Sequence, residues 1–221
     1  MLAKYLSFFL PITISKKKST VSKSIEVTWN NGQLVLDSQN TNYSYGSLQR
    51  ILRKGLKYIG FERIKKFENI LILGVAGGSV IKTLVDEIKF KGKITGVEID
   101  ADIIAIATTY FKLNEIQNLE IVIDDAFEYV LKTKEKYDLI VIDIFQDTVM
   151  PNFLFEDFFI NRVNFLLNLN GFILFNTMVI NDKDSIRNLE YKKKFNTNYS
   201  LRMYPKVEEH NELFTIKKLV L

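Results

Sequence analysis

The stretch ILILGVAGGSVIKTL, residues 70–84, decides the fold of this chain. Its first four residues are a short apolar run rich in β-branched side chains, which is typical of a buried parallel strand. Glycines at 74, 77 and 78 follow, and a helix-like segment begins at Ser79. A strand that enters a helix through a glycine turn commonly binds a nucleotide in α/β proteins. We therefore expect a nucleotide or nucleoside at this turn.

Strand-like and helix-like segments alternate on the C-terminal side of the turn. Further strands are expected at residues 93–99, 119–124, 137–144 and 171–178, and helices at 79–89, 101–111, 126–133 and 155–167. This alternation predicts an α/β, Rossmann-like fold whose mostly parallel sheet is covered on both faces by helices.

The two ends of the chain have a different pattern. Residues 24–29 and 33–37 alternate polar and apolar side chains around Asn31-Gly32, which predicts a β-hairpin. Residues 1–45 are therefore expected to form a small antiparallel β region, and residues 46–221 the main domain. Two extended stretches near the C-terminus, 198–205 and 211–221, predict an antiparallel hairpin at the edge of the main sheet.

The composition excludes several kinds of site. The 221 residues are 47% hydrophobic and 25% charged, as in an ordinary globular protein of one domain with a small appendage. The absence of cysteine excludes disulfides, thiolate metal sites and cysteine nucleophiles. The single histidine, His210, excludes a histidine-cluster metal site, and a solvated turn is its simplest interpretation. We expect no metal.

The positive charge is mild, with a net charge of +4 and a pI of about 9.0. Lysine runs occur at residues 15–19 and 191–195, and a solvated surface is a simpler interpretation for them than an anionic partner. Nucleic-acid binding is therefore not favoured. The N-terminal apolar run is interrupted by Pro11 and then alternates, which favours a strand over a signal peptide. No stretch reaches the ~20 apolar residues of a membrane span. We expect a cytoplasmic protein without a membrane partner.

Polar residues gather where the predicted parallel strands end. In such a sheet the ligand lies beyond the carboxyl ends of the strands. The candidates there are Gly74, Ala76, Gly77, Gly78, Glu98, Ile99, Asp100, Asp124, Asp125, Ala126, Asp143, Asp147, Asn176 and Thr177. The turn lacks the second glycine of the dinucleotide fingerprint and the G-K-[ST] of a P-loop. A phosphate cradle is therefore a weak interpretation.

Two carboxylates favour a nucleoside without phosphate. Glu98 ends the second strand, where it can accept both ribose hydroxyls, and Asp125 follows the third strand, where it can accept from an adenine amino group. Acids repel phosphate but attract a cation, so an adenosyl sulfonium suits the pocket. Asp100 can instead be a simple helix N-cap, and Asp124 a cap or a solvated residue.

The core, residues 70–178, resembles the class I S-adenosylmethionine-dependent methyltransferase fold. It is similar, more narrowly, to the spermidine synthase (polyamine aminopropyltransferase) family. The similarity rests on four segments: LVLDSQNTNYSYGSLQRI (34–51), VEIDADII (97–104), DDAFEYV (124–130) and YDLIVIDIFQD (137–147). The resemblance implies S-adenosylmethionine or its decarboxylated form as cofactor. It also implies Glu98 as the ribose acid and Asp125 with small Ala126 at the adenine.

The departures from the family pattern concern the substrate side. Gly77 stands where the family has an Asp, and Gly46 and Ser47 stand where it has an acid or amide pair. Asp143 and Asp147 are separated by three residues instead of two, with no Pro directly after Asp147. The resemblance therefore implies a retained nucleoside site beside an altered acceptor site.

Catalytic and substrate-binding roles follow from the same comparison. Asp143 is the best candidate for a general base, with Asp147 second, although Asp143 can also serve only as a cofactor ligand or turn cap. Residues 147–155 are expected to form a lid over the pocket. Tyr43 and Tyr45 are expected either to line the acceptor pocket or to belong to the core.

Four functions remain open at this point, with a small-molecule acceptor expected in the first two. Methyl transfer to an unknown small acceptor is favoured, because Gly77 in place of Asp removes an acid that would repel the carboxylate of S-adenosylmethionine. Aminopropyl transfer from decarboxylated S-adenosylmethionine is the alternative. The others are a nucleoside-binding protein without catalysis, conceivable as a homodimer through the N-terminal sheet, and nucleic-acid modification.

Overall fold

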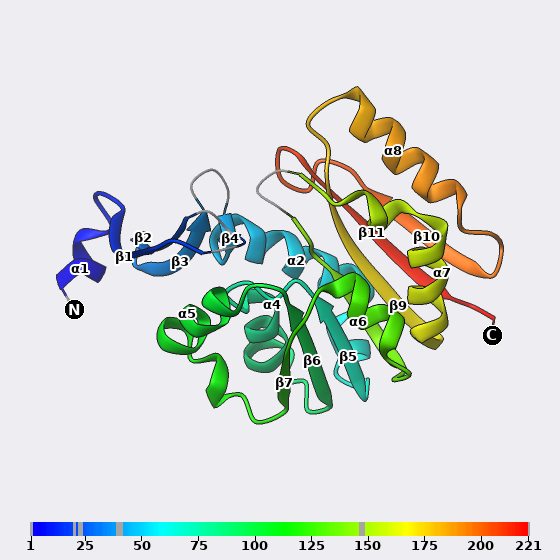
Figure 1. Cartoon of the computed structure of the whole chain (residues 1–221), viewed down its shortest axis with the longest axis horizontal. Helices are drawn as coiled ribbons and strands as arrows, with labels where there is room; N and C mark the ends of the chain where they lie inside the picture. The colour runs from blue at the N-terminus through cyan, green and yellow to red at the C-terminus, as the bar shows by residue number, and fades with distance from the viewer. Residues whose placement is uncertain (1, 20, 22–23, 39–41, 146–148, 221) are drawn as a thin grey trace.

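The computed structural model describes residues 2–19, 21, 24–38, 42–145 and 149–220, and these form two β-sheets (Figure 1). The small sheet has the order β1-β2-β3-β4 and is antiparallel. Its strands are β1 (Ile12–Lys17), β2 (Ile25–Asn30), β3 (Gln33–Ser38) and β4 (Asn42–Ser44). The short helix α1 (Leu2–Leu6) precedes it at the far end of the molecule. Asn31 and Gly32 both have positive φ, 48° and 75°, so the predicted hairpin turn is confirmed.

The large sheet has the order β10-β11-β9-β8-β5-β6-β7. Its strands are β5 (Asn69–Leu73), β6 (Lys93–Glu98), β7 (Leu119–Ile123), β8 (Tyr137–Ile142), β9 (Leu167–Met178), β10 (Tyr199–Tyr204) and β11 (Asn211–Lys218). The pairs among β5 to β9 are parallel, and β11 pairs antiparallel with β9 and β10. The predicted fold class and C-terminal hairpin are therefore confirmed.

Helices cover both faces of this sheet (Figure 1). They are α2 (Gly46–Ile59), α3 (Phe61–Ile64), α4 (Ser79–Lys82), α5 (Ala101–Phe111), α6 (Ala126–Lys132), α7 (Asp157–Leu166) and α8 (Asp182–Lys193). A π-helical turn (Thr83–Glu87) continues α4, and 3₁₀ turns occupy Leu113–Glu115 and Asn152–Phe155. Among the described residues, none of the helices has the length and apolar character needed to cross a bilayer.

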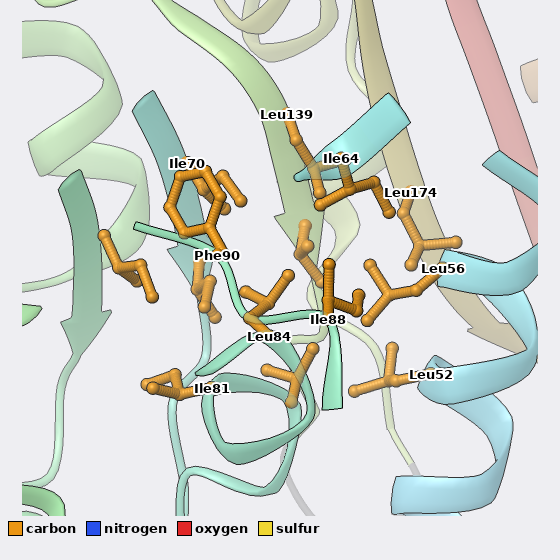
Figure 2. Packing of buried hydrophobic residues seen from close by; sticks show 14 of the residues in the cluster. Leu52, Leu56, Ile64, Ile70, Ile81, Leu84, Ile88, Phe90, Leu139 and Leu174 are labelled. Atoms are coloured by element: carbon orange, nitrogen blue, oxygen red, sulfur yellow. The ribbon is translucent and has the colours of Figure 1, made fainter. Parts of the chain in front are cut away.

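The apolar run of β5 is explained by burial on both faces. Ile70 and Ile72 belong to a core with α2, while Leu71 and Leu73 belong to a second core with α6 and α7. Figure 2 shows the first core, where Leu52 and Leu56 of α2 point toward the sheet. Because both faces of the sheet are covered here, the successive side chains of residues 70–73 in β5 are all buried, and apolar residues do not alternate with polar ones.

Several parts of the chain differ from the expectations. The helix expected at 79–89 becomes π-helical after Lys82 and ends at Glu87, and β9 begins at Leu167, four residues before the predicted strand. Helix α8 was not predicted, and α1 lies in the N-terminal run where a strand was expected. The division of the chain at residue 45 stays a prediction, although β4 ends at Ser44 and α2 begins at Gly46.

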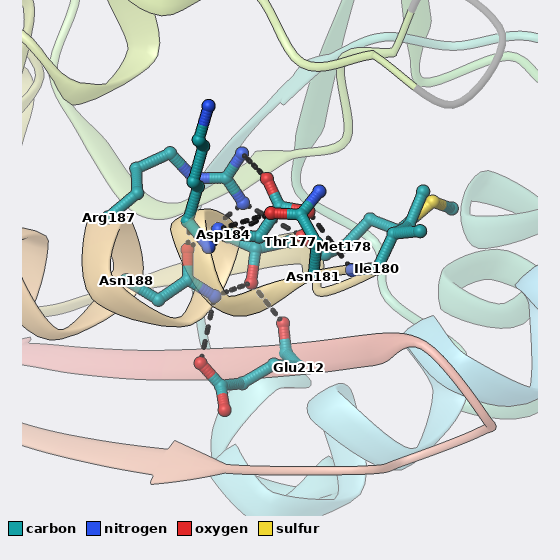
Figure 3. Close-up of polar contacts among 9 residues, drawn as sticks. Thr177, Met178, Ile180, Asn181, Asp184, Arg187, Asn188 and Glu212 are labelled. Atoms are coloured by element: carbon teal, nitrogen blue, oxygen red, sulfur yellow. Dashed lines mark hydrogen bonds and ion pairs between the residues drawn. The ribbon is translucent and has the colours of Figure 1, made fainter.

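A buried polar network holds α8 against the sheet (Figure 3). Asn188 Nδ2 donates to Thr177 Oγ1 and to Glu212 Oε1, each at 2.8 Å. Thr177 Oγ1 in turn donates to the carbonyl of Glu212 at 2.8 Å. All three residues are buried. The network therefore fixes the ends of β9 and β11 beside Asn176 and Asn211, which support the site described below.

Replacing Asn188 by Ala is expected to lower the free energy of unfolding by about 2–3 kcal/mol, because buried polar atoms of Thr177 and Glu212 lose their donor. Urea unfolding measures this loss. The matched control is Asn181→Ala on the same helix, which removes an exposed N-cap worth about 1 kcal/mol. Equal losses in the two variants would contradict a specific role for the buried network.

Candidate active site

The glycine turn lies where the strand order reverses. β5 has β6 on one side and β8 on the other, and ligands of open α/β sheets bind at this switch point. Gly74 directly follows β5 with φ +90°, and a Cβ there would overlap the carbonyl oxygen of Asp143. The absence of a side chain at Gly74 therefore lets the backbone after β5 and after β8 approach closely.

Glu98 is the acid that organises the turn. Its Oε2 accepts from the backbone N–H groups of Val75 and Ala76, both at 3.0 Å, and its Oε1 accepts from Asp100 N at 3.1 Å. Burial raises the pKa of this carboxyl, against the lowering effect of the three backbone donors. Ala76 has φ 47°, a left-handed conformation that places its N–H toward the acid. A carboxylate offers about four acceptor positions, so about one remains for a ligand.

Asp100 is the N-cap of α5, the helix that follows β6. Its simpler interpretation as a helix N-cap is therefore confirmed. Its Oδ1 accepts from Asp102 N at 3.0 Å and Ile103 N at 3.3 Å, and its Oδ2 accepts from Ser19 Oγ. Both carboxylate oxygens of Asp100 are therefore engaged within the protein.

Asp125 caps α6 with one oxygen. Its Oδ1 accepts from Phe127 N at 2.7 Å and from Glu128 N at 3.3 Å. Within the described residues, Oδ2 has no hydrogen-bond partner, so it can accept from a ligand. Ala126 is the first residue of α6 and is partly buried. Asp124 lies 3.7 Å from Lys132 in a surface ion pair.

Ile99, the remaining predicted cofactor ligand, follows β6 directly. Its side chain is 47% exposed, which leaves apolar surface beside Glu98. Its contact with a cofactor stays a prediction.

Asp143 follows β8 and is fixed by two asparagines. Asn176 Nδ2 donates to Asp143 Oδ1 at 2.9 Å, and Asn211 Nδ2 donates to Asn176 Oδ1 at 3.0 Å. Burial, with a smaller contribution from the charge of Glu98, raises the pKa of Asp143 to about 6. The bond from Asn176 opposes this shift. Asp143 Oδ2 has no hydrogen-bond partner among the described residues.

The sequence placed Asn176 at a strand end without a role and missed Asn211. Asn176 directly follows the apolar run of residues 172–175, and that was the available signal, whereas Asn211 begins a strand of mixed polarity. Their contact joins β9 to β11 across 35 positions of the chain, so it depends on a strand register that periodicity does not give.

The raised pKa of Asp143 predicts a pH-dependent stability. The folded protein binds this proton more tightly than the unfolded chain, so the stabilisation is complete below pH ~3.8 and is lost as pH rises through about 6. Asp143→Asn is therefore expected to raise the free energy of unfolding at pH 8 by roughly 1–3 kcal/mol, with little effect at pH 4. Urea unfolding at both pH values measures it, and an equal change at both would contradict the assignment.

The predicted acceptor side is only partly visible. Asp147 and the side chain of Tyr43 lie outside the described residues. Tyr45 stacks on Phe111 with ring centroids 4.5 Å apart, and burial raises the pKa of its hydroxyl. The ring of Tyr45 also lies beside Gly77, so it contributes to a small core at the edge of the turn.

Residues 147–155, the predicted lid, are described from Val149 on, and their role as a lid stays a prediction. Met150 is buried, and Phe153 packs against Phe127 and Phe159 at ring centroid distances of 5.3 and 5.0 Å. These side chains belong to the core of α6 and α7, because burial there removes their apolar surface from water.

Position 77 has no room for the acid of the family pattern. A Cβ on Gly77 would lie 2.8 Å from Ser44 Cβ and 3.3 Å from Tyr45 Cε2. Ser44 Oγ also accepts from Ser79 N at 3.1 Å, which holds the corner after β4 against the turn. Glycine at 77 is therefore explained by packing.

A family model and several known proteins are similar to this chain in sequence. The model of the spermine/spermidine synthase domain matches residues 49–218. The chain is 29% identical over 141 residues to a polyamine aminopropyltransferase of Vibrio vulnificus, covering 62% of this chain and 47% of the relative. It is 33% identical over 118 residues to that of Prochlorococcus marinus (strain MIT 9215), covering 50% and 41%. The chain thus spans about half the length of the curated relatives it matches.

Solved structures support the same fold. A spermidine synthase from Thermotoga maritima has a TM-score of 0.70 at 20% identity, covering 94% of this chain and 72% of that one. Human methyltransferase-like protein 13 in complex with SAH has a TM-score of 0.66 at 21% identity, covering 79% and 83%.

The expectation of methyl transfer as the main activity is wrong. The matching family model is that of the spermine/spermidine synthase domain, and the matching relatives are polyamine aminopropyltransferases. The argument for methyl transfer rested on charge at Gly77, whereas that glycine is explained by its contacts with Ser44 and Tyr45.

Proposed function

Because the chain belongs to the spermine/spermidine synthase family, we propose that it transfers the aminopropyl group of decarboxylated S-adenosylmethionine to an amine of the polyamine class. The observation that carries the proposal is Asp143. This acid has a pKa of about 6, one oxygen held by Asn176, and its backbone directly against Gly74.

The residues at the strand ends fit the nucleoside part of this donor. Glu98 retains about one acceptor position for a ribose hydroxyl, and Asp125 Oδ2 can accept from the adenine amino group. The backbone of the turn allows close approach of a ligand without phosphate. The proposed donor-binding residues are Gly74, Ala76, Gly77, Gly78, Glu98, Ile99, Asp125, Ala126 and Asp143.

Bound decarboxylated S-adenosylmethionine supplies an aminopropyl carbon that is activated by the adjacent sulfonium. Asp143 Oδ2 takes the proton that the attacking amine must lose, because Oδ1 is occupied by Asn176. A base with a pKa near 6 is ionised at neutral pH and still accepts a proton, which is the range general bases require. Asn176 and Asn211 orient the carboxylate. Positioning of this kind contributes much of the rate in such reactions.

The acceptor side of the proposal rests on the sequence. We assign Tyr43, Tyr45 and Asp147 to the amine, with Asp147 as a second acid whose charge would attract it. Gly77 brings no acid to this side, and Gly46 and Ser47 begin α2 in place of the acid or amide pair of the family pattern. That replacement favours one other candidate, a protein that binds the nucleoside without transfer.

Asn176→Ala tests the positioning of the base. The bond from Asn176 lowers the pKa of Asp143, so its removal is expected to move the acidic limb of the kcat/KM profile above its position near pH 6. Steady-state rates from pH 5 to 9 measure the shift. An unchanged limb with a lower plateau would mean that Asn176 acts only on stability.

The proposal is tested by calorimetric titration with decarboxylated S-adenosylmethionine and, separately, with S-adenosylmethionine. We expect tighter binding of the decarboxylated donor, followed by release of 5′-methylthioadenosine when a diamine is added. Tight binding without release would favour the nucleoside-binding candidate. Binding of neither donor would contradict both.

A further inference from the structure

The positive charge of the chain is concentrated at its N-terminus. Residues 1–25 contain five lysines and no acidic residue, and the first acid of the chain is Glu26. The net charge of the whole chain is +4, so the remaining residues carry no net positive charge. Such asymmetry indicates an anionic partner for this segment.

The same segment exposes large apolar side chains. Phe9 is 85% exposed, and the other strongly exposed apolar residues are Leu2, Tyr5, Leu6, Phe8 and Leu10. They belong to α1 and the residues after it, at the end of the molecule farthest from the large sheet (Figure 1). Six large exposed apolar side chains within residues 2–10 point to an interaction site.

Hydrogen bonds hold this segment against the turn between β2 and β3. Ser7 is buried, its Oγ accepts from Gly32 N at 2.9 Å, and its carbonyl accepts from Asn31 N at 3.0 Å. The segment is thus fixed on the turn between β2 and β3. The ring of Phe8 also lies against this turn, because a Cβ on Gly32 would come within 2.4 Å of it, so the segment is not a loose tail.

Lysines accompany the apolar side chains. Lys17 and Lys18 are exposed and make no ion pair within the described residues, whereas Lys16 lies 2.6 Å from Glu26. Lys4 is within the apolar stretch itself, with its Nζ 5.8 Å from the ring centre of Trp29. The segment therefore carries exposed apolar side chains and, in Lys17 and Lys18, cations that have no ion-pair partner among the described residues.

We propose that residues 2–18 dock on the surface of an anionic lipid bilayer. Apolar side chains that enter the acyl boundary, together with lysines that meet lipid phosphates, are the combination that binds proteins to membrane surfaces. A second copy of the segment would bring lysines against lysines, and a nucleic acid would leave Phe9 and Leu10 in water. The contact is peripheral, because no described helix can cross a bilayer. It goes beyond the proposed transfer and revises the expectation of no membrane partner.

The test is sedimentation of the full chain with vesicles of phosphatidylcholine alone or mixed with phosphatidylglycerol. We expect binding to the mixed vesicles that weakens with salt, and little binding to phosphatidylcholine. Lys17→Gln/Lys18→Gln is expected to weaken partitioning about 30-fold, at about 1 kcal/mol for each lysine. Phe9→Ser/Leu10→Ser is expected to weaken it at least tenfold.

The matched control is Ile186→Ser/Leu189→Ser, which removes exposed apolar side chains from α8 instead. It should bind vesicles as the unchanged protein does, and the melting temperatures of all variants report on folding. Equal binding to neutral vesicles, loss of binding in the α8 control, or no vesicle binding at all would overturn the proposal. So would a dimer in light scattering that the Phe9→Ser/Leu10→Ser change dissociates without any vesicle binding.

Discussion

Replacing Asp143 by Asn is expected to lower kcat for aminopropyl transfer by about 10²–10⁴-fold, the usual contribution of a general base. Asn keeps the size of the side chain and an oxygen that accepts from Asn176, so the geometry of the site is preserved. What is lost is the oxygen that takes the proton of the amine. Donor affinity should change much less than kcat, because Asn at position 143 keeps the contact with Asn176 and the other proposed donor-binding residues are unchanged. Steady-state kinetics and calorimetry on the same preparation measure the two effects.

The matched control for this variant is Asp138→Asn, which lies near the start of the same strand. Asp138 accepts from Glu68 N, Asn69 N and Asn168 Nδ2, and so has a structural role at the opposite edge of the sheet. We expect a loss of stability there with kcat nearly unchanged. Parallel losses of kcat and donor affinity in Asp143→Asn would make Asp143 a donor ligand and not a base.

Replacing Glu98 by Gln is expected to weaken nucleoside binding about 30–100-fold, the effect of losing a charged hydrogen bond of about 2–3 kcal/mol. The same change should lower the free energy of unfolding by about 2 kcal/mol. A glutamine amide cannot accept from both Asp100 N and the turn, where Glu98 accepts three backbone donors. Titration with 5′-methylthioadenosine and urea unfolding measure the two losses.

Asp102→Asn serves as the control for Glu98, because it neutralises an exposed acid in the first turn of α5. It should leave both affinity and stability nearly unchanged. Unaltered nucleoside affinity in Glu98→Gln, with the expected loss of stability, would reduce Glu98 to a support of the turn.

Much of the fold and part of the site follow from the sequence. The run of residues 70–73 and its alternation with helical segments predict a parallel sheet, and such a sheet brings Glu98 and Asp143 to one edge. The contacts that Glu98 and Asp125 make within the protein could not be predicted. Glu98 binds the turn and Asp125 caps α6 because backbone donors lie within their reach, which only the folded chain reveals.

Contacts between distant segments were the hardest to predict. Asn211 reaches Asn176 only because β11 pairs antiparallel with β9 in one register. The wrong preference for methyl transfer has a similar origin. Gly77 suggested the removal of a charge, whereas Ser44 and Tyr45 fill the space beside it from the opposite side of the turn.

The central claim is tested most directly by incubating the purified chain with isotope-labelled decarboxylated S-adenosylmethionine and a panel of diamines, with analysis of the products by mass spectrometry. We predict a labelled aminopropyl group on an amine, formed together with an equal amount of 5′-methylthioadenosine and lost in Asp143→Asn. Two results would contradict the account. In the first, the unsubstituted protein binds the donor tightly but no amine acquires the aminopropyl group. In the second, transfer continues unchanged in Asp143→Asn.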